Sequence, residues 1–329
     1  MDARLQSLIG CHSTPGDEGE VRDVLEACWK ADGLFIERLG DYAVTVRVPS
    51  EVSGKPVLLI CAHMDSPGYS IDRLRVAPCA NAGLTFFGVT ELGSPGFDGK
   101  SVEGVLKTRR GKFNGTLSNV AAAESEPDLR FTMEPSEAAQ AEVRHGDRIC
   151  FTPRCRQDGH VLESPFLDNR LGCWMLARLA VEARAWQTKY QLVLGATACE
   201  EMCGSGARVL AAHVRPDLAL VLDTTYESGA QNVLLGKGPV LTLSDASILL
   251  SPALRDRVLD RMAQAGVPMQ TEVYNFSGTD ARAFPQQGLT CPVLPLLVPT
   301  RGNHAPREMA DLRDVEIWLS AVRAVAELF

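Results

Sequence analysis

The sequence predicts an α/β protein, in which a mixed β-sheet flanked by helices is interrupted by a small all-β domain. Two observations predict this architecture. Apolar strands alternate with helical patterns before residue 65 and again after residue 168, as in a sheet with helices on both faces. Between these parts lies a stretch rich in glycine, proline and short alternating segments, which favours β-strands joined by turns. The length of 329 residues, 45% of them hydrophobic, allows one large domain and a smaller one.

The first part of the chain begins with a helix and continues with strands. Residues 16–33 carry apolar side chains at helical spacing. Residues 35–48 predict two strands around a turn at Gly40. The unbroken apolar run over residues 56–62 predicts a strand that is buried on both faces.

The middle of the chain has a different composition. We expect residues 66–152 to form the inserted all-β domain, such as a small barrel. Within it, residues 121–142 are rich in alanine and acidic side chains, and their pattern gives no assignment. The α/β domain would then consist of residues 1–65 and 153–329.

After Asp168 the alternation of helices and strands returns. The predicted helices cover residues 171–186, 204–213, 252–266 and 311–329. The predicted strands cover residues 190–199, 218–224, 268–275 and 291–298. These elements complete the predicted sheet.

Charge and cysteine usage restrict the class of partner and the compartment. The formal net charge is −8, which argues against a nucleic-acid partner because phosphate binding requires a basic face. No apolar run approaches about 18 residues, so no membrane span is expected. The N-terminus lacks the pattern of a signal peptide. Five of the ten cysteines, Cys61, Cys150, Cys173, Cys199 and Cys291, lie in or beside apolar stretches, and no CxxC pair occurs, which predicts reduced thiols in a cytoplasmic protein.

Two adjacent acidic residues, Glu200 and Glu201, directly follow the apolar run over residues 191–197. Two carboxylates at the end of a core strand are costly unless positive charge meets them. Neighbouring residues at a strand end point in different directions. We therefore expect one glutamate to bind a metal and the other to handle a proton.

Further candidate ligands stand at strand ends or in turns of the predicted α/β domain. They are His63, Asp65, Asp168, Asp223 and His304. In open α/β sheets, ligands bind outside the carboxyl ends of the strands. Each residue alone has a plainer explanation, such as a helix N-cap for Asp168. Together they favour a site, because most follow long apolar runs where unpaired charge is costly.

The chemistry of these side chains suits a pair of divalent metal ions. Imidazole and carboxylate ligands without thiolates fit zinc, cobalt or manganese. Two histidines and three carboxylates, one of them bridging, would hold two metals about 3.5–4 Å apart and position a hydrolytic water. A carboxylate outside the ligand set would serve as general base.

Six motifs in this chain stand in the order found in one known family. They are residues 62–65, 168–173, 196–201, Asp223, residues 278–281 and residues 299–309. On these motifs the chain resembles the M42 family of metallo-aminopeptidases, relatives of other di-zinc exopeptidases. The resemblance implies hydrolysis of the N-terminal residue of short peptides, with two divalent metal ions per subunit.

The resemblance also implies a role for each candidate ligand. His63 and Asp223 would bind one metal, and Glu201 and His304 would bind the other. Asp168 would bridge the two metals.

Other residues gain roles by the same resemblance. Glu200 would be the general base, and Asp65 would orient His63 in a carboxylate–histidine arrangement. Thr279 and Asp280 are expected to line the substrate pocket. The inserted β domain would build a homo-oligomer, up to a dodecamer.

Two departures from the family pattern keep the substrate open. Ser66-Pro67 stands where Glu-Ile is usual, and Gly302-Asn303 replaces an aromatic–aliphatic pair, which is expected to loosen the loop of His304. One alternative is a di-metal amidase or deacylase that acts on N-acylated amino acids or small amides. The other is a catalytically idle binding protein on the same fold.

Overall fold

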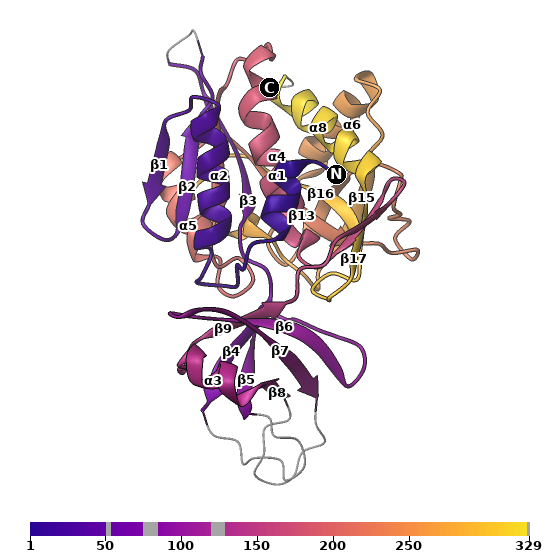
Figure 1. Cartoon of the computed structure of the whole chain (residues 1–329). Coiled ribbons are helices and arrows are strands. Elements are labelled where there is room, and N and C mark those ends of the chain that lie inside the picture. The colour runs from indigo at the N-terminus through magenta and orange to yellow at the C-terminus, as the bar shows by residue number, and fades with distance from the viewer. Residues whose placement is uncertain (51–53, 75–84, 120–128, 328–329) are drawn as a thin grey trace.

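The computed structural model describes residues 1–50, 54–74, 85–119 and 129–327. A large sheet covered by helices forms one part, and a closed β-barrel forms a second lobe beneath it (Figure 1). The chain passes to the barrel after β3 (Val57–His63) and leaves it after β9 (Arg148–Phe151). The predicted fold class, an α/β sheet with a small inserted all-β part, is confirmed.

The large part is built on an eleven-stranded mixed sheet. Its main path has the order β1-β2-β12-β3-β13-β16-β17-β11-β10, with β14 paired to β16 and β15 paired to β14. Its other strands are β1 (Ile36–Leu39), β2 (Ala43–Arg47), β10 (Arg156–Asp158), β11 (Val161–Ser164), β12 (Gln191–Thr197), β13 (Leu218–Tyr226), β14 (Val240–Asp245), β15 (Gln270–Tyr274), β16 (Val293–Arg301) and β17 (Glu308–Asp311). The four central strands β12, β3, β13 and β16 run parallel. Their carboxyl ends therefore meet at one edge of the sheet.

The central strand β3 is buried on both faces, as its apolar run predicts. Leu58 and Ile60 belong to one core cluster, whereas Leu59 and Cys61 belong to another, because successive side chains of a strand alternate. The helices that pack in the same cluster as Leu58 and Ile60 are α1 (Ala3–Ile9), α2 (Gly19–Ala31), α4 (Leu167–Glu182), α6 (Pro252–Gln264) and α8 (Leu312–Ala326). The opposite face is covered by α5 (Ser205–Val214) and α7 (Ala283–Gln286).

The barrel closes in the order β4-β5-β8-β7-β6-β9. Its remaining strands are β4 (Gly68–Arg73), β5 (Thr85–Leu92), β6 (Ser101–Thr108), β7 (Gly111–Asn119) and β8 (Leu129–Met133). Leu106, Leu117, Phe131 and Ile149 fill its core and are fully buried. Closure leaves none of these strands with a free edge.

Several short elements were not predicted from the sequence. They include α1, which Asp2 caps through the backbone N–H groups of Arg4 and Leu5, and the strands β10, β11, β14 and β17. Elements of three to seven residues carry too little periodicity to identify. In the unassigned stretch, residues 129–142 form β8 and the helix α3 (Pro135–Ala141), while residues 121–128 lie outside the described residues.

The C-terminal helix is present as α8, and the last two residues of its predicted span, 328–329, lie outside the described part. No helix in the described ranges is long and apolar enough to cross a bilayer.

Substitution of Gly206 in α5 tests how closely this helix packs against the backbone just before the glutamate pair. A Cβ there would come within 2.3 Å of the backbone nitrogen of Ala198 and 2.5 Å of the carbonyl oxygen of Tyr42. We expect Gly206→Ala to lower the free energy of unfolding by about 1–3 kcal/mol, because backbone atoms cannot rotate away. Urea unfolding measures this, with Gly229→Ala as control because no atom lies within 4 Å of its Cβ. Equal stability of the two variants would contradict the expectation.

Candidate metal centre

The five candidate ligands converge at the carboxyl edge of the central strands. His63 ends β3, Asp223 lies in β13, and Glu201 follows β12. Asp168 lies at the start of α4, and His304 lies in the loop after β16. Since the parallel strands end at the same edge, residues far apart in the sequence become neighbours.

Asp168 stands between the two histidines. Its Oδ1 lies 3.2 Å from His63 Nε2, and its Oδ2 lies 3.3 Å from His304 Nε2. His63 Nε2 is also 3.1 Å from Asp223 Oδ1, and His304 Nε2 is 3.4 Å from Glu201 Oε1. Each histidine is thus paired with one further carboxylate, and both pairs meet at Asp168.

The electrostatics of this cluster show an excess of negative charge. Burial and the charge of Asp168 raise the pKa of Glu201 well above its usual value. Burial opposes protonation of His63, but Asp223 and Asp168 nevertheless raise its pKa well above the usual value. Burial also opposes ionisation of Asp168, yet hydrogen bonds from the two histidines lower its pKa. Positive charge is therefore favoured throughout the cluster.

The donor set fits divalent metal ions. Ligand atoms of His63, Asp168 and Glu201 all lie within 4.8 Å of one another. Glu201 Oε1 is buried and accepts no hydrogen bond from any described residue. A buried carboxylate oxygen in this state is costly unless a cation or a proton compensates its charge, and nitrogen and oxygen ligands without sulfur suit zinc, cobalt or manganese.

Asp65 fixes the turn that carries the glutamate pair. Its buried carboxylate accepts hydrogen bonds from the backbone N–H groups of Glu200 at 3.0 Å and Glu201 at 3.1 Å. His63 Nδ1 lies 3.0 Å from the backbone carbonyl of Asp65 but 3.7 Å from its carboxylate. Because a carbonyl only accepts, Nδ1 carries a proton, and Nε2 is the ring nitrogen that faces the aspartates and that a neutral imidazole could offer to a metal. Asp65 thus contacts His63 mainly through its carbonyl, which differs from the expected carboxylate arrangement.

Glu200 lies beside the ligands and is held by an arginine that the sequence analysis missed. Arg282 Nη2 donates to Glu200 Oε1 and to the Glu200 carbonyl, both at 2.8 Å. Burial raises the pKa of Glu200 well above its usual value, while the charges of His63 and Arg282 oppose that rise. The only signal for Arg282 in the sequence is its position directly after the motif at residues 278–281.

Glu308 also contacts the candidate site, and the sequence analysis gave it no role. Its Oε1 accepts the backbone N–H of His304 at 3.0 Å, and its Oε2 accepts that of Asp168 at 2.9 Å. Only 2% of the residue is exposed. One carboxylate therefore positions the backbone of two candidate ligands. The only sign of this role in the sequence is that Glu308 belongs to the motif at residues 299–309.

The residues that depart from the family pattern are bonded into the site. Ser66 Oγ donates to the carbonyl of Asp168 at 2.6 Å. Asn303 donates to Thr224 Oγ1 at 2.8 Å and accepts from Thr300 Oγ1 at 2.7 Å. These bonds oppose the loosening of the His304 loop that the sequence led us to expect.

A cavity of about 370 Å³ opens over the candidate ligands. Thr279 lines it, as expected, together with Glu200 and Met202. Asp280 is not part of this lining, because it is 1% exposed and accepts a hydrogen bond from Thr197 Oγ1 at 2.5 Å. It supports the end of β12 from behind the cavity.

Aromatic side chains form part of the cavity wall. Tyr226, Tyr274 and Phe276 all line it. The ring centroids of Tyr226 and Tyr274 are 5.9 Å apart, and those of Tyr274 and Phe276 are 5.8 Å apart. The cavity therefore offers apolar surface beside the charged cluster.

Buried histidine and carboxylate side chains gathered beside a further buried carboxylate are typical of metal-dependent hydrolases. The sequence profile of the M42 glutamyl aminopeptidases matches residues 43–319, and the chain belongs to this family. The protein is accordingly an aminopeptidase, a hydrolase of peptide bonds.

Individual relatives are distant but cover most of the chain. The glutamyl aminopeptidase of Lactococcus lactis is 28% identical over 85% of this chain and 82% of its own length. The lysyl aminopeptidase of Pyrococcus furiosus is 26% identical over 93% of this chain and 91% of its own length. The Pyrococcus horikoshii TET1 peptidase, which can assemble into a tetrahedron or a large octahedral shell, superimposes with a TM-score of 0.83. It is 23% identical and covers 99% of both chains.

Glu308→Ala tests whether this carboxylate positions the ligands. We expect metal affinity to fall about 10–100-fold, because the backbone of His304 and Asp168 loses its shared acceptor. Competition of the apoprotein with a chromophoric zinc chelator measures the affinity. Glu316→Ala, which removes a largely exposed carboxylate on α8, is the control. Unchanged affinity in Glu308→Ala would show that the loop holds its shape without it.

Proposed function

We propose that the cavity over the ligand cluster is the active site, where the N-terminal residue of a short peptide is removed with the help of two divalent metal ions. The observation that carries this proposal is the position of Asp168, whose two carboxylate oxygens each face a different histidine. A carboxylate in that position suits a bridge between two metals.

The proposed ligands divide into two sets around this bridge. His63 and Asp223 would hold one metal, since His63 Nε2 is 3.1 Å from Asp223 Oδ1. Glu201 and His304 would hold the other, since their ligand atoms are 3.4 Å apart. Asp168 would be shared. Zinc, cobalt and manganese all suit these donors.

Glu200 is the proposed general base. When bound, the metals supply polarisation of the scissile carbonyl and a lowered pKa for the attacking water. Glu200 would accept the proton of that water at its carboxylate and pass it to the departing amine. Arg282 positions this carboxylate through its hydrogen bonds to Oε1 and to the backbone carbonyl. The substrate would place its free amine near the metals.

Family membership disfavours the two alternatives, an amidase acting on acylated substrates and an idle binding protein. All five candidate ligands and the proposed base lie at one site, which an idle protein would not require. A free N-terminal amine therefore remains the proposed substrate feature.

A homo-oligomer, up to a dodecamer, is proposed for the assembly, with the barrel as an oligomerisation module within residues 66–152. Its support is the similarity in fold to the tetrahedral and octahedral TET1 peptidase. A cytoplasmic location remains a proposal based on cysteine usage, and the nine cysteines within the described residues are free thiols.

Glu200→Gln tests which of the two adjacent glutamates is the general base and which binds metal. We expect hydrolysis to fall at least about 100- to 10,000-fold with metal content unchanged, because the amide cannot accept the proton. Elemental analysis and hydrolysis of a free-amine peptide, compared with its N-acetylated form, provide the readouts. Glu201→Gln is the matched control and should lose metal. The reverse pattern would mean that the roles of the two residues are exchanged, and faster cleavage of the acetylated peptide would favour the amidase.

Removal of metal should lower both activity and stability. Without cations the buried carboxylates repel one another, so dialysis against a chelator should abolish hydrolysis and lower the unfolding midpoint. Metal at 100 times its dissociation constant should restore about 2.7 kcal/mol of stability. Denaturant unfolding with and without added zinc, cobalt or manganese measures the effect. A folded chain that takes up no divalent ion would contradict the proposed centre.

A further inference from the structure

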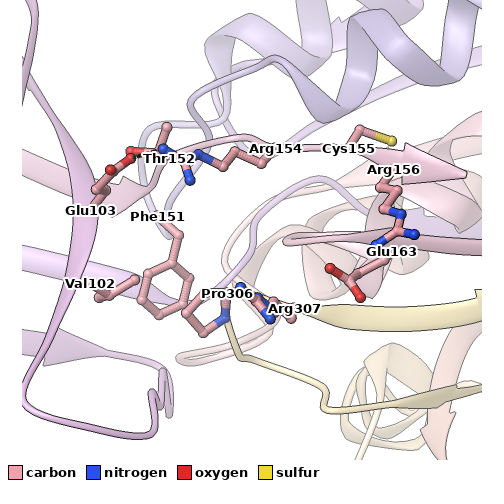
Figure 2. A pocket seen from close by; sticks show the side chains of 10 residues that line it. All are labelled: Val102, Glu103, Phe151, Thr152, Arg154, Cys155, Arg156, Glu163, Pro306 and Arg307. Atoms are coloured by element: carbon pink, nitrogen blue, oxygen red, sulfur yellow. Dashed lines mark hydrogen bonds and ion pairs between the residues drawn. The ribbon is translucent and has the colours of Figure 1, made fainter.

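A second cavity lies at the junction between the barrel and the sheet (Figure 2). Its volume is about 350 Å³. Glu103 and Phe151 line it from the barrel, and Arg156 and Arg307 line it from the α/β part. It shares no lining residue with the cavity over the metal centre.

The charge of this second cavity is set by arginines. Arg154 is paired with Glu103. The side chains of Arg156 and Arg307 form no hydrogen bond or ion pair within the described parts of the chain. Glu163 also lines the cavity and stands opposite Arg156 in the β10–β11 pair, but no ion pair joins it to Arg156 or Arg307 among the described residues. Two guanidinium groups thus remain available to a ligand, on a chain whose net charge is −8.

The remaining wall of the cavity is apolar. Phe151 is 2% exposed, and its ring is held edge-on by Tyr69 and Phe97 at centroid distances of 5.9 and 6.4 Å. Val102 and Pro306 complete this wall. The Phe151 ring is fixed in place but only a small part of it reaches the cavity, so the half-buried Val102 and Pro306 supply most of the apolar surface.

We propose that this junction cavity binds a small organic carboxylate that carries an apolar or aromatic body. The planar guanidinium of arginine matches a carboxylate with two parallel hydrogen bonds. The apolar body would rest against Phe151, Val102 and Pro306. The volume of about 350 Å³ lies within the range of small-molecule sites. The cavity therefore suits a ligand with one charged end and one apolar end.

The position of the cavity gives such a ligand contact with both parts of the protein. It would touch β6 and β9 of the barrel and β10 of the sheet. Arg307 also stands between His304 and Glu308, in the loop that Glu308 holds. A bound carboxylate would thus bridge the two lobes beside a metal-ligand loop.

Binding of 4-phenylbutyrate to the assembled, metal-loaded protein tests the proposal, with isothermal titration calorimetry as the readout. We expect saturable binding that weakens about tenfold in Arg156→Gln and again in Arg307→Gln, the loss of one charged hydrogen bond each. 4-Phenylbutyramide, which keeps the body without the charge, should bind at least about tenfold more weakly. Arg323→Gln, an exposed arginine on α8, is the control and should bind as the wild type does.

Several results would overturn the proposal. One is the absence of 4-phenylbutyrate binding up to about 10 mM, and another is equal binding of 4-phenylbutyramide. A third is binding that is unchanged in Arg156→Gln and Arg307→Gln, as expected if the ligand occupies the metal centre instead. If inorganic phosphate bound as tightly as 4-phenylbutyrate, the apolar wall would contribute nothing to binding, and that part of the proposal would be wrong. Arg156→Lys, which keeps the positive charge but not the planar fork, should retain part of the affinity and so separates the loss of charge from any disturbance of β10.

Discussion

The buried carboxylate of Asp168 is the interaction on which the functional site depends. It lies between His63 and His304, so that two pairs of candidate ligands meet at one residue. Carboxylates gathered in a buried place repel one another unless cations or protons compensate. The raised pKa values of Glu201 and His63, and the Glu201 Oε1 that accepts no hydrogen bond from the described residues, are consequences of that single constraint. The same constraint makes the site suitable for divalent metals.

The surrounding residues hold this costly cluster in place. Asp65 binds the backbone of the glutamate pair, and Glu308 binds the backbone of two ligands on other elements. Arg282 supplies the positive charge that faces Glu200. These supports all act on backbone or charge near the reacting groups. Hydrogen bonds within the protein thus hold the candidate ligands and Glu200 in position, and groups that are positioned beforehand favour catalysis.

The barrel is attached close to this site at both ends. The chain leaves the sheet at His63 and returns shortly before Asp168, so the insertion separates two candidate ligands whose nearest side-chain atoms lie 3.2 Å apart. Lys107 and Lys112 of the barrel reach Asp17 and Glu20 of the α/β part. Ser66, in the first connection, donates to the carbonyl of Asp168. The junction cavity lies on the second connection, so both connections border elements of the site.

The sequence by itself determined the α/β class, the inserted β part and the five candidate ligands, because long apolar runs and the charged residues that end them are local features. It did not reveal α1 or the short strands β10, β11, β14 and β17, whose periods are too short to detect. It also missed Arg282 and Glu308, and it placed Asp280 in the pocket lining rather than behind it. Only the tertiary structure decided these points, because a hydrogen-bond partner is set by which strand ends meet at one edge of the sheet. That meeting depends on the strand order, which no local pattern records.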